Sequence, residues 1–420
     1  MNSFNYLKML MYIILSLAAL GWKNPIILID EIEIGMHPQF IDLLTDNLSE
    51  FNNDSTNLFI STHSPIFVSN LIKKEIKTSI YRVNCINFST VIEKMKPLTS
   101  PKYNSLITMN DASCYFANAL VFVEGASEIQ LFQNKHIQRL FPKLRYVDIY
   151  PFDSNNTKLS LVKPEVVNYN IPYLLLVDMD KIINYTKHDR FKINSDELVN
   201  PLSSSRVEKL EKMMFFQANR DSRKLSTYHL KQYISNVMSK STFRLVSDGY
   251  YFRDRLFEKL IHLIRHYCLY YKVFPVATTI EGVIINTNNT DKTLSWIISK
   301  ENVDVALLNK VLDIDKSWSK KDCIKYRTLV LRLMHGGKLD TLQTFNKAKT
   351  DNVLPKEVTL KITDLRKNYC KKASGWIIEF IDYYFENFLR DEKDQSIRRE
   401  LFKNDFPELS SILHTIEKMV

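Results

Sequence analysis

The sequence predicts an α/β protein in which two successive series of parallel strands and helices are followed by a helical C-terminal part. Short apolar runs that end in an acidic residue, at 25–30 and 120–124, are typical of buried strands in parallel sheets. Segments with helical periodicity separate such runs, and this alternation favours parallel sheets with right-handed crossovers. From about residue 290, helical patterns dominate to the end of the sequence.

The first series occupies residues 1–98 and begins with a predicted buried apolar helix at 5–20. A strand, a helix, a strand, a helix and a β segment are then expected in chain order at 25–30, 38–52, 57–61, 65–73 and 78–95. The sequence becomes polar over 99–110, with proline and several serines and asparagines, which indicates a domain boundary there.

The second series predicts a domain over residues 110–345, with its first helix at 126–140. Residues 181–270 have charged, helical patterns without a clear strand and therefore predict a helical insertion into this domain. Residues 346–420 predict a helical C-terminal region that includes an apolar and aromatic helix at 374–390. The strands of the second sheet are expected at 120–124, 145–150, 173–178 and 272–277.

The composition bounds the class of protein. A chain of 420 residues with 45% hydrophobic residues is long enough for a large core and for two domains. The formal net charge of +10 fits a nucleic-acid partner, but a solvated basic surface explains it equally well. Five cysteines without a CxxC pair indicate neither a disulfide framework nor a zinc site, which favours a reducing, cytoplasmic location.

Residues 7–20 form an apolar run that resembles a signal peptide. The run is too short for a comfortable membrane span, which needs roughly 20 apolar residues. Because the predicted strand at 25–30 follows directly, we interpret the run as a buried helix and expect no membrane association. A secreted or membrane-anchored protein is the alternative, and cell fractionation distinguishes the two.

Asp30 and Glu31 end the first predicted strand. In nucleotide hydrolases an acid in this place holds Mg²⁺, and its neighbour polarises the attacking water. His63 ends the next strand, where it could contact a γ-phosphate or cap the following helix. The alternative interpretation of the two acids is a pair of carboxylates at the exposed end of a buried strand.

The ordered pair LIDEIEIGMHP and ISTHSP resembles the Walker B, D-loop and switch-histidine series of ABC-type ATPases, as found in SMC-like and OLD (overcoming lysogenisation defect) proteins. The resemblance implies that Asp30, Glu31 and His63 bind nucleotide. The sequence holds no G-x-x-x-x-G-K-[ST] loop to wrap phosphates. We therefore expect either a vestigial site, or one completed by a missing N-terminal part, with ATP bound only in the second case.

A second set of acids begins at the end of the strand at 120–124. Glu124 ends this strand, Gly125 permits a tight turn, and Glu128 lies one helical turn further on. The alternative for this pair is a helix start with acids near its positive end. Asp178 ends the strand at 173–178 and Asp180 follows two residues later, and alternation along an extended chain would place both on one side. Such carboxylates repel one another unless a cation lies between them.

An E-G-x-x-E motif at one strand end, followed two strands later by D-x-D, resembles the TOPRIM domain of topoisomerases, primases and OLD-family nucleases. The resemblance to the nuclease branch rests on two further motifs, T-T-I-E-G at 278–282 and H-G-G-K at 335–338. It implies that Glu281 completes a second metal site and that Lys338 lies near the scissile phosphate. A helix C-terminus with a cation is the alternative for Lys338.

Together these motifs predict a metal-dependent DNA endonuclease or nickase of the OLD type. Two Mg²⁺ or Mn²⁺ ions roughly 3.5 to 4 Å apart would activate water and neutralise the phosphate. The expected catalytic residues are Lys338, Glu124 and Asp178, and the expected metal ligands are Glu124, Glu128, Asp178, Asp180 and Glu281.

The biological role and the partners follow from family resemblance alone. The C-terminal part, with its aromatic helix, looks like OLD-type effectors of antiphage systems, including retron-associated ones. This implies phage defence, DNA as partner, a homo-oligomer and, in a retron, a reverse transcriptase with its RNA–DNA product. Two alternatives stay open: a non-catalytic ATPase-like sensing subunit of a defence complex, and a topoisomerase- or primase-like TOPRIM protein.

Overall fold

The computed structural model describes residues 26–51, 57–96, 104–152, 157–185, 191–203, 222–240, 255–300, 304–313, 320–335 and 375–420, with residues 360, 363 and 364, and without 75, 77, 87 and 278. They divide into two compact units. The first unit comprises the chain up to Leu120 and the segment Phe152–Pro172, and the second comprises Val121–Pro151 and Tyr173–Val420. The helix predicted at 5–20 lies outside the described residues.

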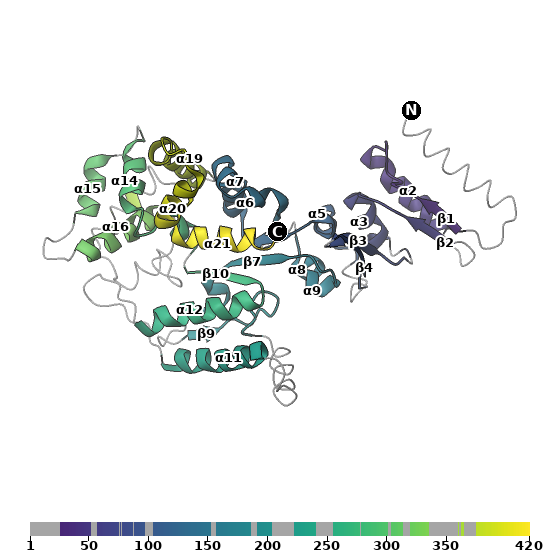
Figure 1. Ribbon diagram of the computed structural model, residues 1–420, viewed down its shortest axis with the longest axis horizontal. Coiled ribbons are helices and arrows are strands. Elements are labelled where there is room, and N and C mark those ends of the chain that lie inside the picture. Colours follow the sequence, from purple (N-terminus) through teal and green to yellow (C-terminus); the bar gives the residue numbers. More distant parts are fainter. Residues whose placement is uncertain are drawn as a thin grey trace. The chain divides into compact units, whose positions relative to one another are not determined.

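The first unit contains a pair of parallel strands, β1 (Ile26–Ile29) and β2 (Asn57–Ile60). Helices α2 (Pro38–Phe51) and α3 (Pro65–Lys73) follow these strands and pack against each other (Figure 1). Their apolar faces share a small core whose buried members are Ile32, Ile41, Leu44, Leu48 and Phe67. This arrangement agrees with the strands and helices expected over residues 25–73.

The rest of the first unit is a hairpin and several short helices. Strands β3 (Tyr81–Ile86) and β4 (Ser89–Lys94) pair in antiparallel fashion, as expected for the β segment at 78–95. The hairpin is joined to the second segment of this unit by a backbone hydrogen bond from Lys96 to Val167, 3.2 Å long. The short helices are α5 (Met109–Ser113), η1 (Cys114–Phe116), α8 (Leu159–Val162) and α9 (Pro164–Val167).

The second unit is built on a four-stranded parallel sheet with the order β10-β7-β5-β6, which confirms the α/β class expected for this part of the chain. Nearly every residue of the two central strands, β7 and β5, and of the edge strand β10 is buried, because helices cover the sheet. Helix α12 packs on β10, and α11 packs on α12 (Figure 1). The strands are β5 (Leu120–Val123), β6 (Asp148–Pro151), β7 (Tyr173–Asp178) and β10 (Val273–Val276).

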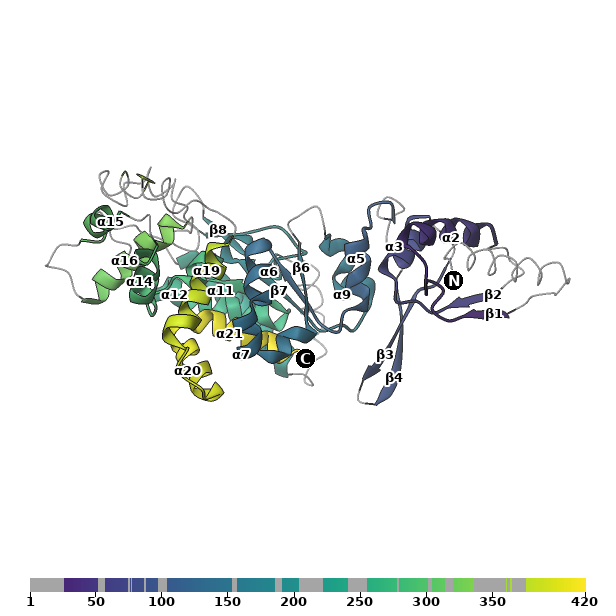
Figure 2. The same cartoon turned by 90° about the horizontal axis from the view of Figure 1, so that it is seen from above.

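The helices of the C-terminal part belong to the same unit. Helix α19 packs on α6 and α7, and α20 packs on α7 (Figures 1 and 2). Helix α21 packs on α13 and the η2 turn. The helices of the second unit are α6 (Ala126–Gln133), α7 (Lys135–Leu140), η2 (Pro142–Tyr146), η3 (Met179–Lys181), α11 (Ser222–Lys240), α12 (Arg255–Tyr270), α13 (Ile280–Ile284), α14 (Thr290–Ile298), α15 (Val305–Leu312), α16 (Lys320–Met334), α19 (Trp376–Phe388), α20 (Gln395–Asp405) and α21 (Pro407–Glu417).

Three expectations for local structure were wrong. The single helix at 126–140 is two helices, because Asn134 is extended and its side chain accepts hydrogen bonds from the backbone of His136 and Ile137. The strand expected at 145–150 starts later, because the η2 turn occupies its first residues. The proposed helical insertion contains a short antiparallel hairpin, β8 (Ile183–Tyr185) with β9 (Phe191–Ile193). Each of these strands has only three residues, which is too short for its alternation of apolar and polar residues to give a periodic signal.

Asn134 also connects two parts of the second unit that are far apart in sequence. Its amide nitrogen donates to Asp382 of α19 at 2.8 Å, while its oxygen caps α7. We expect Asn134→Ala to lower the free energy of unfolding by about 1 to 2 kcal/mol, measured by urea denaturation, because both interactions are lost. Gln133→Ala, an exposed neighbour, is the control. Equal stability of the two variants would contradict the capping role.

Candidate functional site

Glu124 connects the ends of two neighbouring strands in the second unit. It directly follows β5, and its Oε1 accepts a hydrogen bond of 2.7 Å from the backbone nitrogen of Asp178, the last residue of β7. Its Oε2 lies 3.9 Å from Nζ of Lys181. Lys181 is a charged residue of this region that sequence reasoning missed, although it directly follows the D-x-D motif.

Glu128 lies in the first turn of α6 and is only 9% exposed. Burial raises the pKa of its carboxyl group to about 7, although hydrogen bonds from the backbone of Glu128 and Gly125 act in the opposite direction. The negative charges of Glu124 and Glu281 raise this pKa further. Two carboxylates from other elements therefore act electrostatically on Glu128.

Gly125 occupies the turn between Glu124 and Glu128, at the N-cap of α6. A Cβ atom added at Gly125 would lie 3.6 Å from Oε2 of Glu128, so the Glu128 carboxylate folds back over this turn. The backbone of Gly125 is extended, with φ of −153°, and needs no left-handed geometry. The glycine therefore matters for the space beside the carboxylate and not for its backbone conformation.

Glu281 is the third acidic residue of this region, and it follows a different strand of the same sheet. It lies in the first turn of α13, directly after β10, which is the parallel neighbour of β7, and is 7% exposed. Arg332 of α16 donates to the carbonyl oxygens of Gly282 and Ile285 at 3.4 and 3.0 Å. Helix α13, which carries Glu281, is therefore fixed by a helix later in the chain.

The expected relation between Asp178 and Asp180 was wrong. The strand ends at Asp178, and Met179–Lys181 form a 3₁₀ turn in which Met179 is buried. A 3₁₀ turn has three residues per turn, so residues two apart do not share a side as they do in a strand. Both aspartates are half-buried, and the carbonyl oxygen of Asp180 accepts from Asn194 at 3.4 Å.

Lys338 and its two preceding glycines lie outside the described residues. The first residue of that motif, His335, directly follows α16 and is 4% exposed. Its ring lies 5.5 Å from the ring of Trp296 and 4.5 Å from that of Trp376. Burial lowers the pKa of His335 to about 4, so the residue is neutral at physiological pH and belongs to the aromatic core.

Carboxylate oxygens are the kind of ligand that Mg²⁺ and Mn²⁺ prefer. Within the described residues, however, no group of three or more histidine, cysteine, aspartate or glutamate side chains is arranged closely enough to hold a metal ion. The structure brings Glu124, Glu128 and Glu281 into electrostatic range and joins Asp178 to Glu124 through its backbone. Binding of a divalent ion would require these side chains to close around it.

The first unit contains Asp30, Glu31 and His63, the residues predicted to bind nucleotide. Because β1 and β2 are parallel and in register, their carboxyl ends lie at one edge. The hydroxyl of Ser61 donates to Asp30 and accepts from the backbone nitrogen of Glu31 at 3.0 Å. Nε2 of His63 lies 3.8 Å from Oε1 of Glu31. Asp30, Glu31 and His63 thus lie together, and Ser61 is a bridging residue that sequence reasoning missed.

The backbone at Glu31 has a φ of +46°, in the left-handed region that residues with a side chain seldom adopt. Gly35, four residues later, has a φ of +72° and adopts such a conformation without cost. Strained residues with side chains gather at functional sites. The strained backbone at Glu31 agrees with a functional role for this turn, although Phe88, Asn168 and Lys272 also have positive φ and belong to no proposed site.

A comparison with known families gives a match to the part of the chain that contains this edge of β1 and β2. Residues 7–69 match the family described as "AAA domain, putative AbiEii toxin, Type IV TA system". The match spans Asp30, Glu31 and His63. Over this segment the chain is therefore similar to AAA-type ATPases.

This match supports the predicted relation to P-loop ATPases for the N-terminal part of the chain. AAA domains in general use nucleotide and Mg²⁺, which agrees with the acids and the histidine at the edge of β1 and β2. The match covers a small part of the chain and does not extend to the acids of the second unit. In the described parts of the chain, no helix has both the length and the apolar character that crossing a membrane requires.

Proposed function

We propose that the second unit is a TOPRIM-type nuclease that hydrolyses phosphodiester bonds in DNA with Mg²⁺ or Mn²⁺. The observation that carries this proposal is the buried Glu128 carboxylate, whose pKa is raised by burial and by Glu124 and Glu281. Burying two acids, Glu128 and Glu281, near the half-buried Glu124 is unfavourable for folding unless a cation joins them. A protein gains from such an arrangement when the acids hold divalent ions.

The roles of the residues follow from their positions. Glu124, Asp178 and Glu281 come from the carboxyl ends of three adjacent strands, β5, β7 and β10, where parallel sheets present their ligands. Glu128 and Asp180 complete the proposed set of ligands. A pair of divalent ions bound there would neutralise the phosphate and activate water. Lys181 beside Glu124, together with Lys338, is proposed to attract the DNA phosphate.

The match of residues 7–69 to a family of toxin–antitoxin ATPases favours a role in antiviral defence. We propose that the AAA-type region senses or regulates and that the second unit cleaves. Under this proposal, Asp30, Glu31 and His63 contribute to a nucleotide site that another part of the protein completes. A homo-oligomer, and in a retron a reverse transcriptase and its RNA–DNA product, are the proposed partners.

The test is cleavage of supercoiled and linear DNA with Mg²⁺, Mn²⁺ or EDTA. We expect wild-type protein to cleave with either metal. Asp178→Asn and Glu124→Gln should reduce cleavage by about 100-fold or more, since each removes a proposed metal ligand. Glu400→Gln, an exposed charge change on α20, should cleave normally. Full cleavage by a well-folded Asp178→Asn variant would remove the proposed site.

A non-catalytic sensing subunit is the second candidate. The observation that favours it is that the described acidic side chains do not form a ready-made metal cluster. Calorimetric titration of Mn²⁺ into the protein separates the two candidates. Micromolar binding that is lost in Asp178→Asn supports the nuclease, whereas no binding by the wild-type protein supports the sensing subunit.

A further inference from the structure

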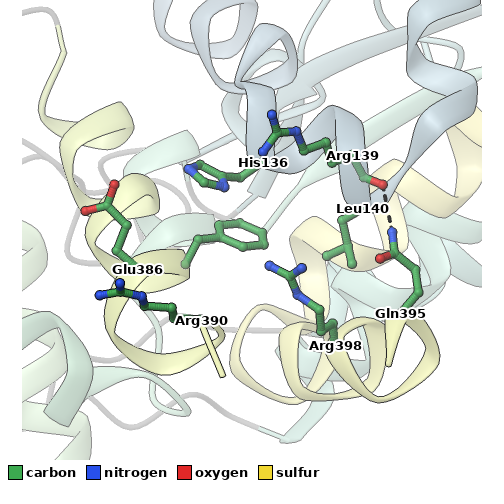
Figure 3. A pocket seen from close by; sticks show the side chains of 8 residues that line it. His136, Arg139, Leu140, Glu386, Arg390, Gln395 and Arg398 are labelled. Carbon is green, nitrogen blue, oxygen red and sulfur yellow. Dashed lines mark hydrogen bonds between the residues drawn. The ribbon is translucent and has the colours of Figure 1, made fainter. Parts of the chain in front are cut away.

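A pocket of about 470 Å³ lies between α7, α19 and α20 of the second unit. His136 and Arg139 of α7 form one wall, and Arg398 of α20 lies opposite (Figure 3). Glu386 near the end of α19 and Arg390 just after it complete the charged lining. None of these residues has a part in the acidic site proposed above.

The charge of the pocket is unbalanced. Three guanidinium groups line it, against the single carboxylate of Glu386. In the described part of the chain, Arg139, Arg390 and Arg398 form no ion pair with any carboxylate. Two positive charges are therefore left without a counter-charge, and a doubly charged anion would balance them.

Two side-chain nitrogens in the pocket lack hydrogen-bond partners, of which the arginine nitrogen is a donor and the histidine nitrogen is a donor in one ring tautomer. Nε of Arg398 and Nε2 of His136 are both buried, and neither has a hydrogen-bond partner. The carboxylate oxygen of Asp382 lies 3.7 Å from Nε2 of His136, which is too far for a hydrogen bond. Unsatisfied buried donors cost free energy, and an anion in the pocket would supply the acceptors that they lack.

The walls of the pocket are held in place. His136 stacks on Phe385 with a centroid distance of 5.0 Å, and the guanidinium of Arg398 lies 5.9 Å from the same ring. Gln395 donates to the carbonyl oxygen of Arg139 at 2.7 Å, which is visible in Figure 3. A neighbouring bond of 2.7 Å from Arg399 to Leu140 also joins α20 to α7. The ring of His136 and the guanidinium of Arg398 are therefore positioned before a ligand arrives, which lowers the entropic cost of binding.

We propose that this pocket binds a phosphomonoester group, carried either by a free nucleotide or by the terminal phosphate of a nucleic-acid strand. A terminal phosphate carries close to two negative charges at neutral pH and matches the two unbalanced positive charges. Guanidinium forks suit the geometry of phosphate oxygens. The volume exceeds the need of a single phosphate and leaves room for an attached sugar.

The test is binding of the full chain in EDTA, so that the acidic site is not engaged. A labelled oligonucleotide with a 5′-phosphate is compared with the same oligonucleotide ending in a hydroxyl, by fluorescence anisotropy. Inorganic phosphate and AMP are tested as direct ligands by calorimetry and as competitors. We expect Arg398→Gln and Arg390→Gln each to weaken binding of the phosphorylated ligand by roughly tenfold or more.

Arg145→Gln, a substitution of an exposed arginine of the same unit outside the pocket, is the matched control and should bind normally.

Preference for the phosphorylated oligonucleotide assigns the site to a strand end, whereas binding of AMP without such a preference assigns it to a free nucleotide. Equal affinity for both oligonucleotides together with no binding of AMP or phosphate overturns the proposal. Equal losses in Arg145→Gln and the pocket variants also overturn it, because they indicate general charge attraction. Arg390 is exposed, so its variant tests the proposal even if Arg398→Gln unfolds.

Discussion

The variant Glu128→Gln is expected to be more stable than the wild-type protein in the absence of metal and to lose metal-dependent cleavage. Burial of the Glu128 carboxylate near Glu124 and Glu281 raises its pKa from 4.5 to about 7, so the ionised form destabilises the folded state. A neutral glutamine of the same shape removes this cost, which is roughly 1 to 3 kcal/mol. Cleavage should fall by about 100-fold or more, because a proposed metal ligand is lost.

The sign of the pH dependence follows from this pKa. The folded state holds its proton on Glu128 over the range in which the unfolded chain releases it. Wild-type stability therefore falls as pH rises from about 4.5 to above 7. The advantage of Glu128→Gln should be near zero at pH 4.5 and complete above pH 7. Thermal unfolding in EDTA at several pH values measures it.

Two comparisons make this result specific. Mg²⁺ or Mn²⁺ should raise the unfolding midpoint of the wild-type protein but not of Glu128→Gln, because only the former binds the ion in its folded state. Glu400→Gln, at an exposed position, should follow the wild-type protein in both assays. A parallel pH profile for wild type and Glu128→Gln would show that Glu128 carries no buried charge.

Arg265→Ala should destabilise the second unit by about 3 kcal/mol. Arg265 of α12 donates to the carbonyl oxygen of Pro275 at 3.1 Å and forms an ion pair with Glu408 of α21. Glu408 also accepts from the backbone nitrogen of Ala277 at 2.8 Å. Both charged side chains are 19% exposed, so removal of the arginine leaves a largely buried carboxylate with one donor fewer.

Urea denaturation of Arg265→Ala, Glu408→Ala and the double variant measures the coupling of this pair. We expect the double variant to lose much less than the sum of the single losses, with a coupling of about 1.5 kcal/mol or more. Glu379→Ala is the control, since Glu379 pairs with Lys300 but is 61% exposed and should lose less than about 1 kcal/mol. A loss of that small size in Arg265→Ala would contradict the structural role of the pair.

Much of the sheet could be predicted because its strands carry continuous apolar runs. Residues 120–124 and 173–178 were expected as strands, and both contain nearly complete buried strands. The break at Asn134 was missed although asparagine is a favoured N-cap, because the apolar periodicity continues across it. Local patterns thus identified buried elements better than they identified the ends of helices.

The candidate sites differ in what the sequence alone could predict. Asp30 and His63 were expected at neighbouring strand ends, because consecutive parallel strands place such residues at one edge. The approach of Glu281 to Glu128 depends on the pairing of β10 with β7, a contact between segments about a hundred residues apart. The arginine pocket is even harder to predict from the sequence, since Arg139 and Arg398 come from helices whose proximity no local pattern indicates.

The bond between Glu408 and Ala277 joins residues 131 positions apart and has a consequence for synthesis of the protein. A ribosome releases the strand that precedes Glu281 long before it releases the helix that secures that strand. The nascent chain must therefore wait for α21 before this edge of the sheet is fastened. Under the proposal that the second unit is a nuclease, the edge that carries Glu281 is completed only after α21 has emerged, so cleavage would begin only in finished chains.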